Sequence, residues 1–180
     1  LTDDITRLIR DEQARQSNRF IEGADLDTYL RRLDERAEIV SEMADGRCRG
    51  FVSFYCNNTA TRQAYITLVL VAPPDRGTGL GRALVTAVLA VCRGRGFATC
   101  RLEVRGDNLA ALAMYQALGF ATVEERAGKH LMECVLWAFA GPSWGRCSRI
   151  PSSARCRRWW LTRRMTSSAW PRASTSWPRR

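Results

Sequence analysis

One stretch of this sequence restricts the fold more than any other: a strand-like run that stops at two prolines and leads through a glycine-rich turn into a helical pattern. Residues 64–71 are rich in branched and aromatic side chains, which favour a β-strand. Pro73 and Pro74 end that strand because proline cannot donate ladder hydrogen bonds. From residue 79 to residue 91 the apolar side chains recur at helical spacing. The sequence therefore predicts a strand, a turn and a helix in direct succession.

The turn itself, Arg-Gly-Thr-Gly-Leu-Gly-Arg at positions 76–82, has the properties of an anion-binding site. Backbone N–H groups at the start of a helix lack intrahelical partners, and the helix dipole adds roughly half a positive charge there. Three glycines leave these N–H groups open to a pyrophosphate, and the two flanking arginines can add charge. The alternative is a tight turn that binds nothing.

Three phosphate-binding signatures can be compared with this turn. A Walker loop needs Gly-Lys-Ser/Thr, whereas the chain has Gly81-Arg82-Ala83. A dinucleotide fingerprint starting at Gly77 fails because Arg82 stands where the third glycine is required. The third pattern, Arg/Gln-x-x-Gly-x-Gly/Ala, is matched without a gap from Arg76 to Gly81. The turn therefore favours this third pattern.

The rest of the chain up to Trp137 alternates between helical and strand-like patterns. The order predicts an α/β fold, in which helices pack on the faces of a sheet that has both parallel and antiparallel pairs. The unit from Ala64 to Val104 should be a right-handed parallel crossover. Helical patterns cover residues 2–16, 25–33, 79–91 and 108–118, and strand-like runs cover residues 37–43, 48–56, 64–71, 97–104, 120–124 and 130–136.

The formal net charge of +10 suggests a nucleic-acid partner until its location is considered. Residues 138–180 contain ten arginines and neither Asp nor Glu, so this segment alone carries the whole excess. The preceding part is neutral, and a neutral folded part has no electrostatic reason to bind a polyanion. We therefore expect no nucleic acid bound to the folded part.

Two domains are predicted: a folded domain over residues 1–138 and a tail over residues 139–180. The tail has no helical or strand repeat, and its arginines are mixed with Trp, Pro and Ser. Such a composition predicts disorder. A GC-rich gene read in a shifted frame would also explain it, and resequencing the gene tests that hypothesis.

Cysteine and histidine usage favours a reducing compartment and no metal site. None of the seven cysteines forms a Cys-x-x-Cys pair and most lie in apolar runs, so we expect buried free thiols in the cytoplasm. His130 is the only histidine. No run of eighteen apolar residues predicts a membrane span, and the charged first twenty residues do not predict a secretory signal. The cysteines are Cys48, Cys56, Cys92, Cys100, Cys134, Cys147 and Cys156.

Two segments resemble the GNAT acetyltransferase superfamily. Residues 66–84 resemble its acetyl-CoA-binding motif, and residues 102–120 resemble its later strand and helix, which end in Gly119-Phe120. The resemblance covers residues 37–137 well and the N-terminal helices loosely, and it does not reach the tail. It implies a GNAT-like mixed sheet that is mostly antiparallel, with a parallel strand–helix–strand core and helices on both faces.

The resemblance also implies acetyl-CoA as co-substrate and assigns residues to it. The central strand would diverge from its neighbour, so that its exposed backbone at Leu70 and Val71 holds the pantetheine arm, with the Val71 amide as oxyanion donor. A primary amine would attack the thioester directly in a ternary complex. The pyrophosphate would be held by Arg76, Gly77, Thr78, Gly79, Leu80, Gly81 and Arg82.

Asn108 and Tyr115 lie seven residues apart, which places them on one face of a helix. By resemblance, Asn108 would contact the cofactor and Tyr115 would protonate the departing thiolate. Asn108 could instead serve only as a helix cap, because Asp107-Asn108 is a good capping sequence. Tyr115 could instead be an amphipathic core tyrosine.

A base must accept a proton from the acceptor ammonium, and Glu103, on the strand beside the cofactor strand, is the main candidate. Glu103 could instead be an ion-pair partner of Arg101 or Arg105, and water could serve as the base. The lesser candidates are Tyr65, His130 and Glu133.

Three functions remain open: two differ in the acetyl acceptor, and the third is not acetyl transfer. The first is acetylation of a small-molecule amine, since residues 51–58 and 64–68 are similar to GNAT members that act on aminosugars. The second is acetylation of a protein N-terminus or lysine. The third, from another class, is binding of nucleic acid or membrane through the tail, where arginine and tryptophan interleave at residues 157–160. Dimerisation is common in the family, so a homodimer is a further expectation.

Overall fold

The computed structural model describes residues 1–17, 19–21 and 25–136, and every predicted helix and strand within them is present. The predicted boundaries are met to within a few residues. The predicted tail lies outside the described residues. In chain order the elements are α1 (Asp3–Arg15), α2 (Leu26–Arg36), β1 (Glu38–Ala44), β2 (Arg47–Tyr55), β3 (Gln63–Val71), a short 3-10 turn (Pro73–Asp75), α3 (Leu80–Gly94), β4 (Thr99–Arg105), α4 (Leu109–Ala117), β5 (Ala121–Arg126) and β6 (Lys129–Val135).

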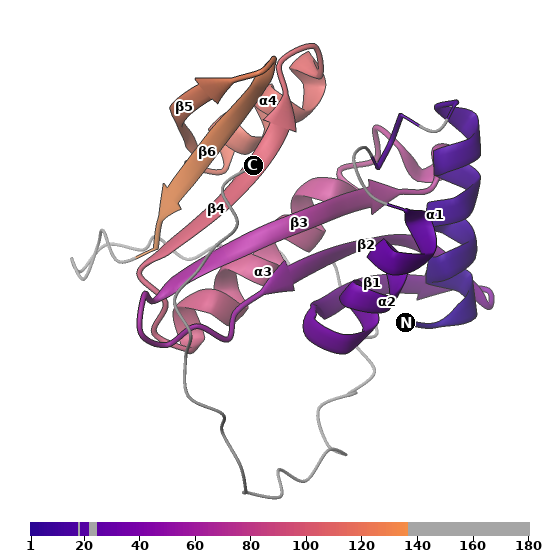
Figure 1. Ribbon diagram of the computed structural model, residues 1–180, viewed down its shortest axis with the longest axis horizontal. Helices are drawn as coiled ribbons and strands as arrows, with labels where there is room; N and C mark the ends of the chain where they lie inside the picture. Colours follow the sequence, from indigo (N-terminus) through magenta and orange to yellow (C-terminus); the bar gives the residue numbers. More distant parts are fainter. Residues whose placement is uncertain (18, 22–24, 137–180) are drawn as a thin grey trace, which may run out of the picture. The chain divides into compact units, whose positions relative to one another are not determined.

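The strands form one six-stranded sheet in the order β1-β2-β3-β4-β6-β5 (Figure 1). Four of the five neighbouring pairs are antiparallel, and β3 and β4 form the parallel pair. Since α3 connects β3 to β4, the strand–helix–strand core lies at the centre of the sheet. These observations confirm a mixed, mostly antiparallel sheet.

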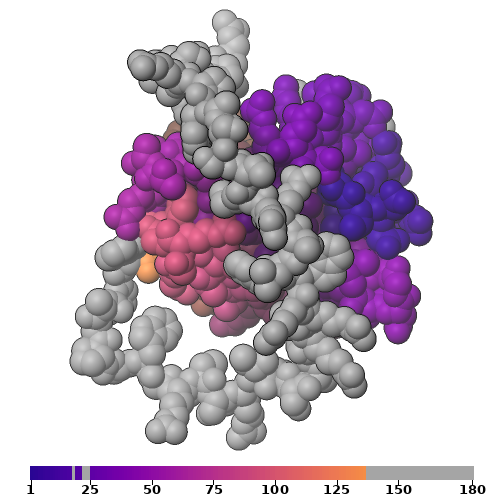
Figure 2. All heavy atoms as spheres, turned by 90° about the horizontal axis from the view of Figure 1, so that it is seen from below, coloured from indigo at the N-terminus to yellow at the C-terminus, as the bar shows by residue number. Residues whose placement is uncertain are grey.

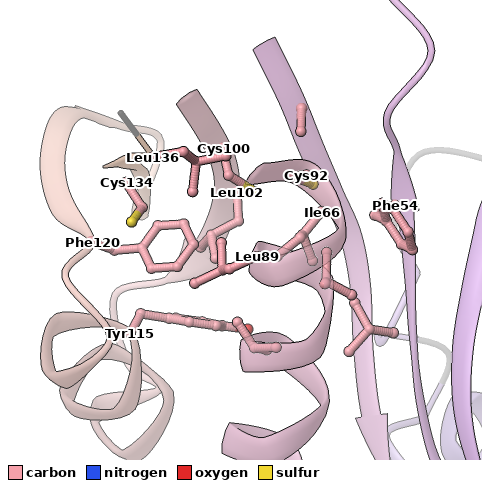
Figure 3. Close-up of a cluster of buried hydrophobic side chains, with 14 of the residues drawn as sticks. Phe54, Ile66, Leu89, Cys92, Cys100, Leu102, Tyr115, Phe120, Cys134 and Leu136 are labelled. Atoms are coloured by element: carbon pink, nitrogen blue, oxygen red, sulfur yellow. The ribbon is translucent and has the colours of Figure 1, made fainter. Parts of the chain in front are cut away.

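Helices cover both faces of this sheet, and each face has its own apolar core. On one face α1 and α2 bury Ile9 and Leu33 against Phe51 of β2. On the other face α3 and α4 bury Val88 and Tyr115, which pack with β2, β3 and β4 (Figures 1 and 3). In the space-filling view the N-terminal residues, in indigo and violet, form one continuous surface with the purple residues that follow them (Figure 2).

The central parallel pair is short, and this shapes the site. Residues 63–66 of β3 pair with residues 99–102 of β4, and the pairing stops there. On the other side of β3, Ser53 of β2 pairs with Leu68 and Phe54 pairs with Ile66, so Thr67 is an extra residue in β3. Such a bulge bends its strand and increases the local twist. The second half of β3 therefore diverges from β4, as the ribbons show (Figure 1).

Candidate functional site

A cleft of about 1000 Å³ lies where β3 and β4 diverge. Its walls come from the second half of β3, the glycine turn with the first turn of α3, the end of β4, one face of α4 and the end of α1. Parallel strands that pair over only four residues leave backbone N–H and C=O groups without partners beyond the last pair. Of the residues predicted to bind the cofactor or to act as the acid and the main base, all except Thr78 line the cleft: Leu70, Val71, Arg76, Gly77, Gly79, Leu80, Gly81, Arg82, Glu103, Asn108 and Tyr115.

The glycine turn presents the backbone at the start of α3 to the cleft. Gly77 and Gly79 have φ angles of 77° and 85°, in the left-handed region that glycine adopts readily. Gly79 caps α3, and the first hydrogen bond of the helix runs from the Ala83 N–H to the Gly79 carbonyl, at 3.0 Å. The N–H groups of the preceding helical residues thus have no intrahelical acceptor. The Thr78 hydroxyl instead donates to the Asp75 carbonyl, at 2.7 Å, and stabilises the turn.

The two arginines that flank the turn have different surroundings. The Arg76 guanidinium donates from Nη2 to Glu12 at 2.8 Å and from Nε to the Val71 carbonyl at 3.0 Å. Its charge is thus already paired with a carboxylate. Arg82, in the first turn of α3, is exposed and lines the cleft. Arg82 is therefore the better placed of the two to add charge to a bound anion.

At the end of β3, the backbone N–H group of Val71 points into the cleft between β3 and β4. Ala72 donates its N–H to the Arg49 carbonyl of β2, at 2.8 Å. Because successive residues of a strand direct their backbone groups to opposite edges, the N–H and C=O of Val71 point toward β4. The Val71 carbonyl accepts Arg76, whereas the pairing with β4 ended at Ile66. The Val71 N–H thus faces the cleft.

Asn108 and Tyr115 both line the cleft from α4. The Asn108 side chain accepts a hydrogen bond from the Ala111 N–H, at 3.2 Å, which confirms the predicted helix cap. Tyr115 is 6% exposed, and its ring contacts Phe120 edge-on at 5.7 Å, in the core shown in Figure 3. Burial raises the pKa of Tyr115 to about 12. Its hydroxyl therefore holds the proton more tightly than that of an exposed tyrosine, which is itself protonated at neutral pH.

Glu103 lies one residue beyond the last parallel pair, at the point where the cleft opens. Of its two arginine neighbours on β4, Arg101 forms an ion pair with Glu133, and Arg105 forms one with Asp107. On the neighbouring strand β3, burial and the Glu103 carboxylate both raise the pKa of Tyr65, which lies within the paired part of that strand. Glu103 therefore belongs to the cleft together with Tyr65.

The remaining base candidates lie elsewhere. His130 Nδ1 is 3.2 Å from a Glu125 oxygen, and Glu133 is the partner of Arg101. Neither His130 nor Glu133 lines the cleft.

The sequence reasoning missed Glu12 of α1, which lines the cleft although it is 4% exposed. A signal was present: Glu12 follows the buried Ile5 and Ile9 at helical spacing, so it falls on the inward face of α1. A carboxylate on such a face needs cationic or hydrogen-bonding partners, because an unpaired buried charge is very costly.

Other predictions concern cysteines, metals and membranes. The five cysteines up to Cys134 are buried and free, which confirms that part of the prediction, while Cys147 and Cys156 lie outside the described residues. Within residues 1–17, 19–21 and 25–136 no group of three or more His, Cys, Asp or Glu side chains could hold a metal ion. In that same part, the helices are too short or too polar to cross a membrane. The arginine- and tryptophan-rich motif of the tail also lies outside it.

Comparison with known proteins shows the family. The model of the acetyltransferase (GNAT) family matches residues 5–120. The mycothiol acetyltransferase of Tsukamurella paurometabola is 42% identical over 84 residues, which cover 47% of this chain and 29% of that protein. The [ribosomal protein bS18]-alanine N-acetyltransferase of Escherichia coli K12 is 38% identical over 68 residues, which cover 38% of this chain and 46% of that protein. The chain thus matches less than half the length of either relative.

Solved structures share the fold. The ribosomal-protein-S18-alanine N-acetyltransferase of E. coli superposes with a TM-score of 0.62 at 24% identity, covering 79% of this chain and 94% of that one. The PaiA N-acetyltransferase of Thermoplasma acidophilum, solved in complex with coenzyme A, superposes with a TM-score of 0.53 at 16% identity, covering 75% and 80%. Because the family model spans well over half of the sequence and these structures share the architecture, the chain belongs to the GNAT acetyltransferase family.

Proposed function

We propose that this protein is an N-acetyltransferase that moves an acetyl group from acetyl-CoA to a primary amine. The observation that carries the proposal is the cleft at the divergence of β3 and β4, which contains both the Val71 N–H and the open start of α3. A thioester needs a hydrogen-bond donor where negative charge develops, and a pyrophosphate needs a backbone anion site. One continuous cleft offers both.

The cofactor would extend along the second half of β3. The backbone around Leu70 and Val71 would bind the pantetheine arm as an added strand, because within the described residues this edge of β3 has no partner strand. The pyrophosphate would bind the N–H groups of the turn between Gly77 and Arg82, and Arg82 would add charge. Asn108 lines the same cleft and would contact the cofactor while it caps α4.

The reaction would be direct attack of the amine nitrogen on the thioester carbon in a ternary complex. The C–N bond forms, the Val71 N–H stabilises the oxyanion of the tetrahedral intermediate, and the C–S bond then breaks. Glu103 would accept the proton of the acceptor ammonium, and Tyr115 would donate its proton to the departing thiolate. Holding donor and acceptor together would supply much of the acceleration.

A small-molecule amine, such as an aminosugar, is the acceptor that we favour. One matching relative is named for a small molecule, mycothiol, and another for a ribosomal protein, so protein acetylation is the second candidate. Cytoplasmic location and a homodimer are also proposed. The first is supported by the buried free thiols of the described residues, and light scattering coupled to size-exclusion chromatography tests the second.

Thiol release from acetyl-CoA against a panel of amines and N-terminal peptides tests the proposed function. The panel is run with the full chain and with residues 1–138, and reactions without acceptor serve as the control. Acceptor-dependent thiol release by both forms would support the enzyme. If no acceptor gives release and only the full chain binds DNA or liposomes, the tail-based function replaces it.

A further inference from the structure

Glu12 of α1 has an unusual environment for a carboxylate that is almost fully buried. It accepts four hydrogen bonds: from Arg15 Nε at 2.9 Å, Arg15 Nη2 at 2.6 Å, Gln16 Nε2 at 2.6 Å and Arg76 Nη2 at 2.8 Å. Two carboxylate oxygens have about four lone-pair sites. Its acceptor capacity is therefore filled, and the carboxylate is fixed in position.

The charge of Glu12 persists over the physiological range. Burial alone would raise the pKa of Glu12, but the hydrogen bonds from Arg15, Gln16 and Arg76 lower it to about 2. Hydrogen bonds between an ionised acceptor and an ionised donor are about twice as strong as neutral ones. Glu12 therefore stays negatively charged at the wall of the cleft over the physiological pH range.

Only one of the four bonds leaves the local segment of α1. Arg15 and Gln16 lie three and four residues after Glu12 on the same helix turn, whereas Arg76 is 64 residues away in the glycine turn. From Arg76 the chain of contacts continues to the Val71 carbonyl, at 3.0 Å. Glu12 therefore reaches the end of β3 through one guanidinium.

The peptide group between Val71 and Ala72 is held on both sides. Its carbonyl accepts Arg76, and its N–H donates to the Arg49 carbonyl of β2, at 2.8 Å. With both polar groups of this peptide occupied, its plane has little freedom to rotate. The neighbouring N–H, that of Val71 itself, then points into the cleft in a fixed direction.

We propose that Glu12 is a positioning residue for acyl transfer, which holds Arg76 on the Val71 carbonyl and so keeps the Val71 N–H aimed at the thioester. This inference rests on the proposed function and adds a residue to it. It also gives Arg76 a different task from the one expected from the sequence. The Arg76 guanidinium organises the strand end, and contact with the pyrophosphate is left to the backbone N–H groups and Arg82.

Steady-state kinetics of the full-length Glu12→Gln variant test the proposal, with the best amine of the acceptor panel. Glutamine keeps the shape but loses the charge that attracts Arg76. We expect kcat to fall at least tenfold, while the Kd for coenzyme A from titration calorimetry changes less than threefold. The exposed neighbour on α1 supplies the control, Asp11→Asn, which should keep the wild-type kcat.

Two further variants separate positioning from simple helix anchoring. Arg76→Lys keeps a positive charge near Glu12, but a single ammonium cannot replace the two separate donors of the guanidinium, so it should reproduce the loss of kcat. The double variant Glu12→Gln/Arg76→Lys should be no slower than the slower single variant, since both changes break the same connection. Multiplying losses, or a Glu12→Gln kcat within twofold of wild type, would overturn the proposal.

Amide resonances give a readout that does not depend on activity. In 15N spectra Glu12→Gln should shift the Val71 and Ala72 peaks well beyond any change seen in Asp11→Asn. Unshifted Val71 and Ala72 peaks would show that Glu12 does not hold the end of β3 in position. If the wild-type chain acetylates nothing in the panel, the proposed function is wrong. The Val71 and Ala72 resonances alone then decide whether Glu12 holds the end of β3 in position.

Discussion

At the scale of single residues, burial has its clearest chemical consequence at Tyr115. A departing thiolate needs a proton, and a tyrosine hydroxyl, with an ordinary pKa of about 10, carries one at neutral pH. Burial raises the pKa of Tyr115 to about 12, so its hydroxyl holds the proton more tightly than that of an exposed tyrosine. The burial also agrees with the alternative prediction that Tyr115 is a core residue, because its ring packs on Phe120. The two roles predicted from the sequence are therefore compatible.

Replacing Tyr115 with phenylalanine removes the hydroxyl and keeps the ring in the core. We expect turnover to fall by about 10²-fold, the lower range for loss of a general acid. The Kd for coenzyme A should hardly change. The matched control is Tyr55→Phe, since Tyr55 does not line the cleft. A Tyr115→Phe enzyme with wild-type turnover would remove Tyr115 from the mechanism.

Glu103 is tested by its neutral isostere. Glu103→Gln keeps the size of the side chain but cannot accept a proton, so kcat/KM for the amine should fall by about 10²- to 10³-fold. The control is Glu125→Gln, a carboxylate that pairs with His130 outside the cleft. Equal kcat/KM values for the two variants would leave water as the base.

At the scale of elements, the strand–turn–helix unit was predictable because its signals are local. Prolines end β3, and left-handed glycines form the turn within a few residues of one another. The bulge at Thr67 was not predictable, since it depends on which residues of β2 pair with β3. The sequence around Thr67 continues the strand pattern without any break. The turn thus follows from local residues, whereas the divergence that opens the cleft is implied only by the resemblance to the family.

A glycine-to-alanine pair tests the turn. Gly79 caps α3 at a φ of 85°, so Gly79→Ala should destabilise the fold by about 1 kcal/mol and weaken coenzyme A binding, because the strained backbone moves the N–H groups. Gly94 ends the same helix, and among the described residues an added Cβ would meet nothing within 4 Å beyond its chain neighbours and its own helix backbone, so Gly94→Ala should be neutral or slightly stabilising. Urea unfolding and calorimetry measure both. Similar effects of the two substitutions would contradict a special role for the turn.

At the scale of the whole molecule, α1 is joined to the sheet by apolar packing and to the glycine turn by the bond between Glu12 and Arg76. A carboxylate whose pKa is lowered on folding stabilises the protein above its unfolded pKa, and this contribution disappears as pH falls toward its folded pKa. For Glu12 these limits are 4.5 and about 2. Acid should therefore weaken the attachment of α1.

Thermal unfolding between pH 7 and pH 3 checks this expectation. Wild type should exceed Glu12→Gln in stability by on the order of 3 kcal/mol near neutral pH, from the pKa shift of Glu12. The difference should shrink steadily below pH 4.5 as the carboxylate binds its proton. Curves that stay parallel down to pH 3 would show that the charge of Glu12 does not stabilise the fold.

The sequence by itself determined the features that depend on neighbouring residues. These are the order of helices and strands, the glycine turn, the Asn108 cap and the burial of the cysteines up to Cys134 in apolar segments. Tertiary structure decided which distant groups meet. The early end of the β3–β4 pairing, the approach of Glu103 to Tyr65 and the bond from Glu12 to Arg76 all join distant segments. Periodicity predicts which face of an element is buried, but not what that face contacts, because contacts follow from the packing of the whole sheet and its helices.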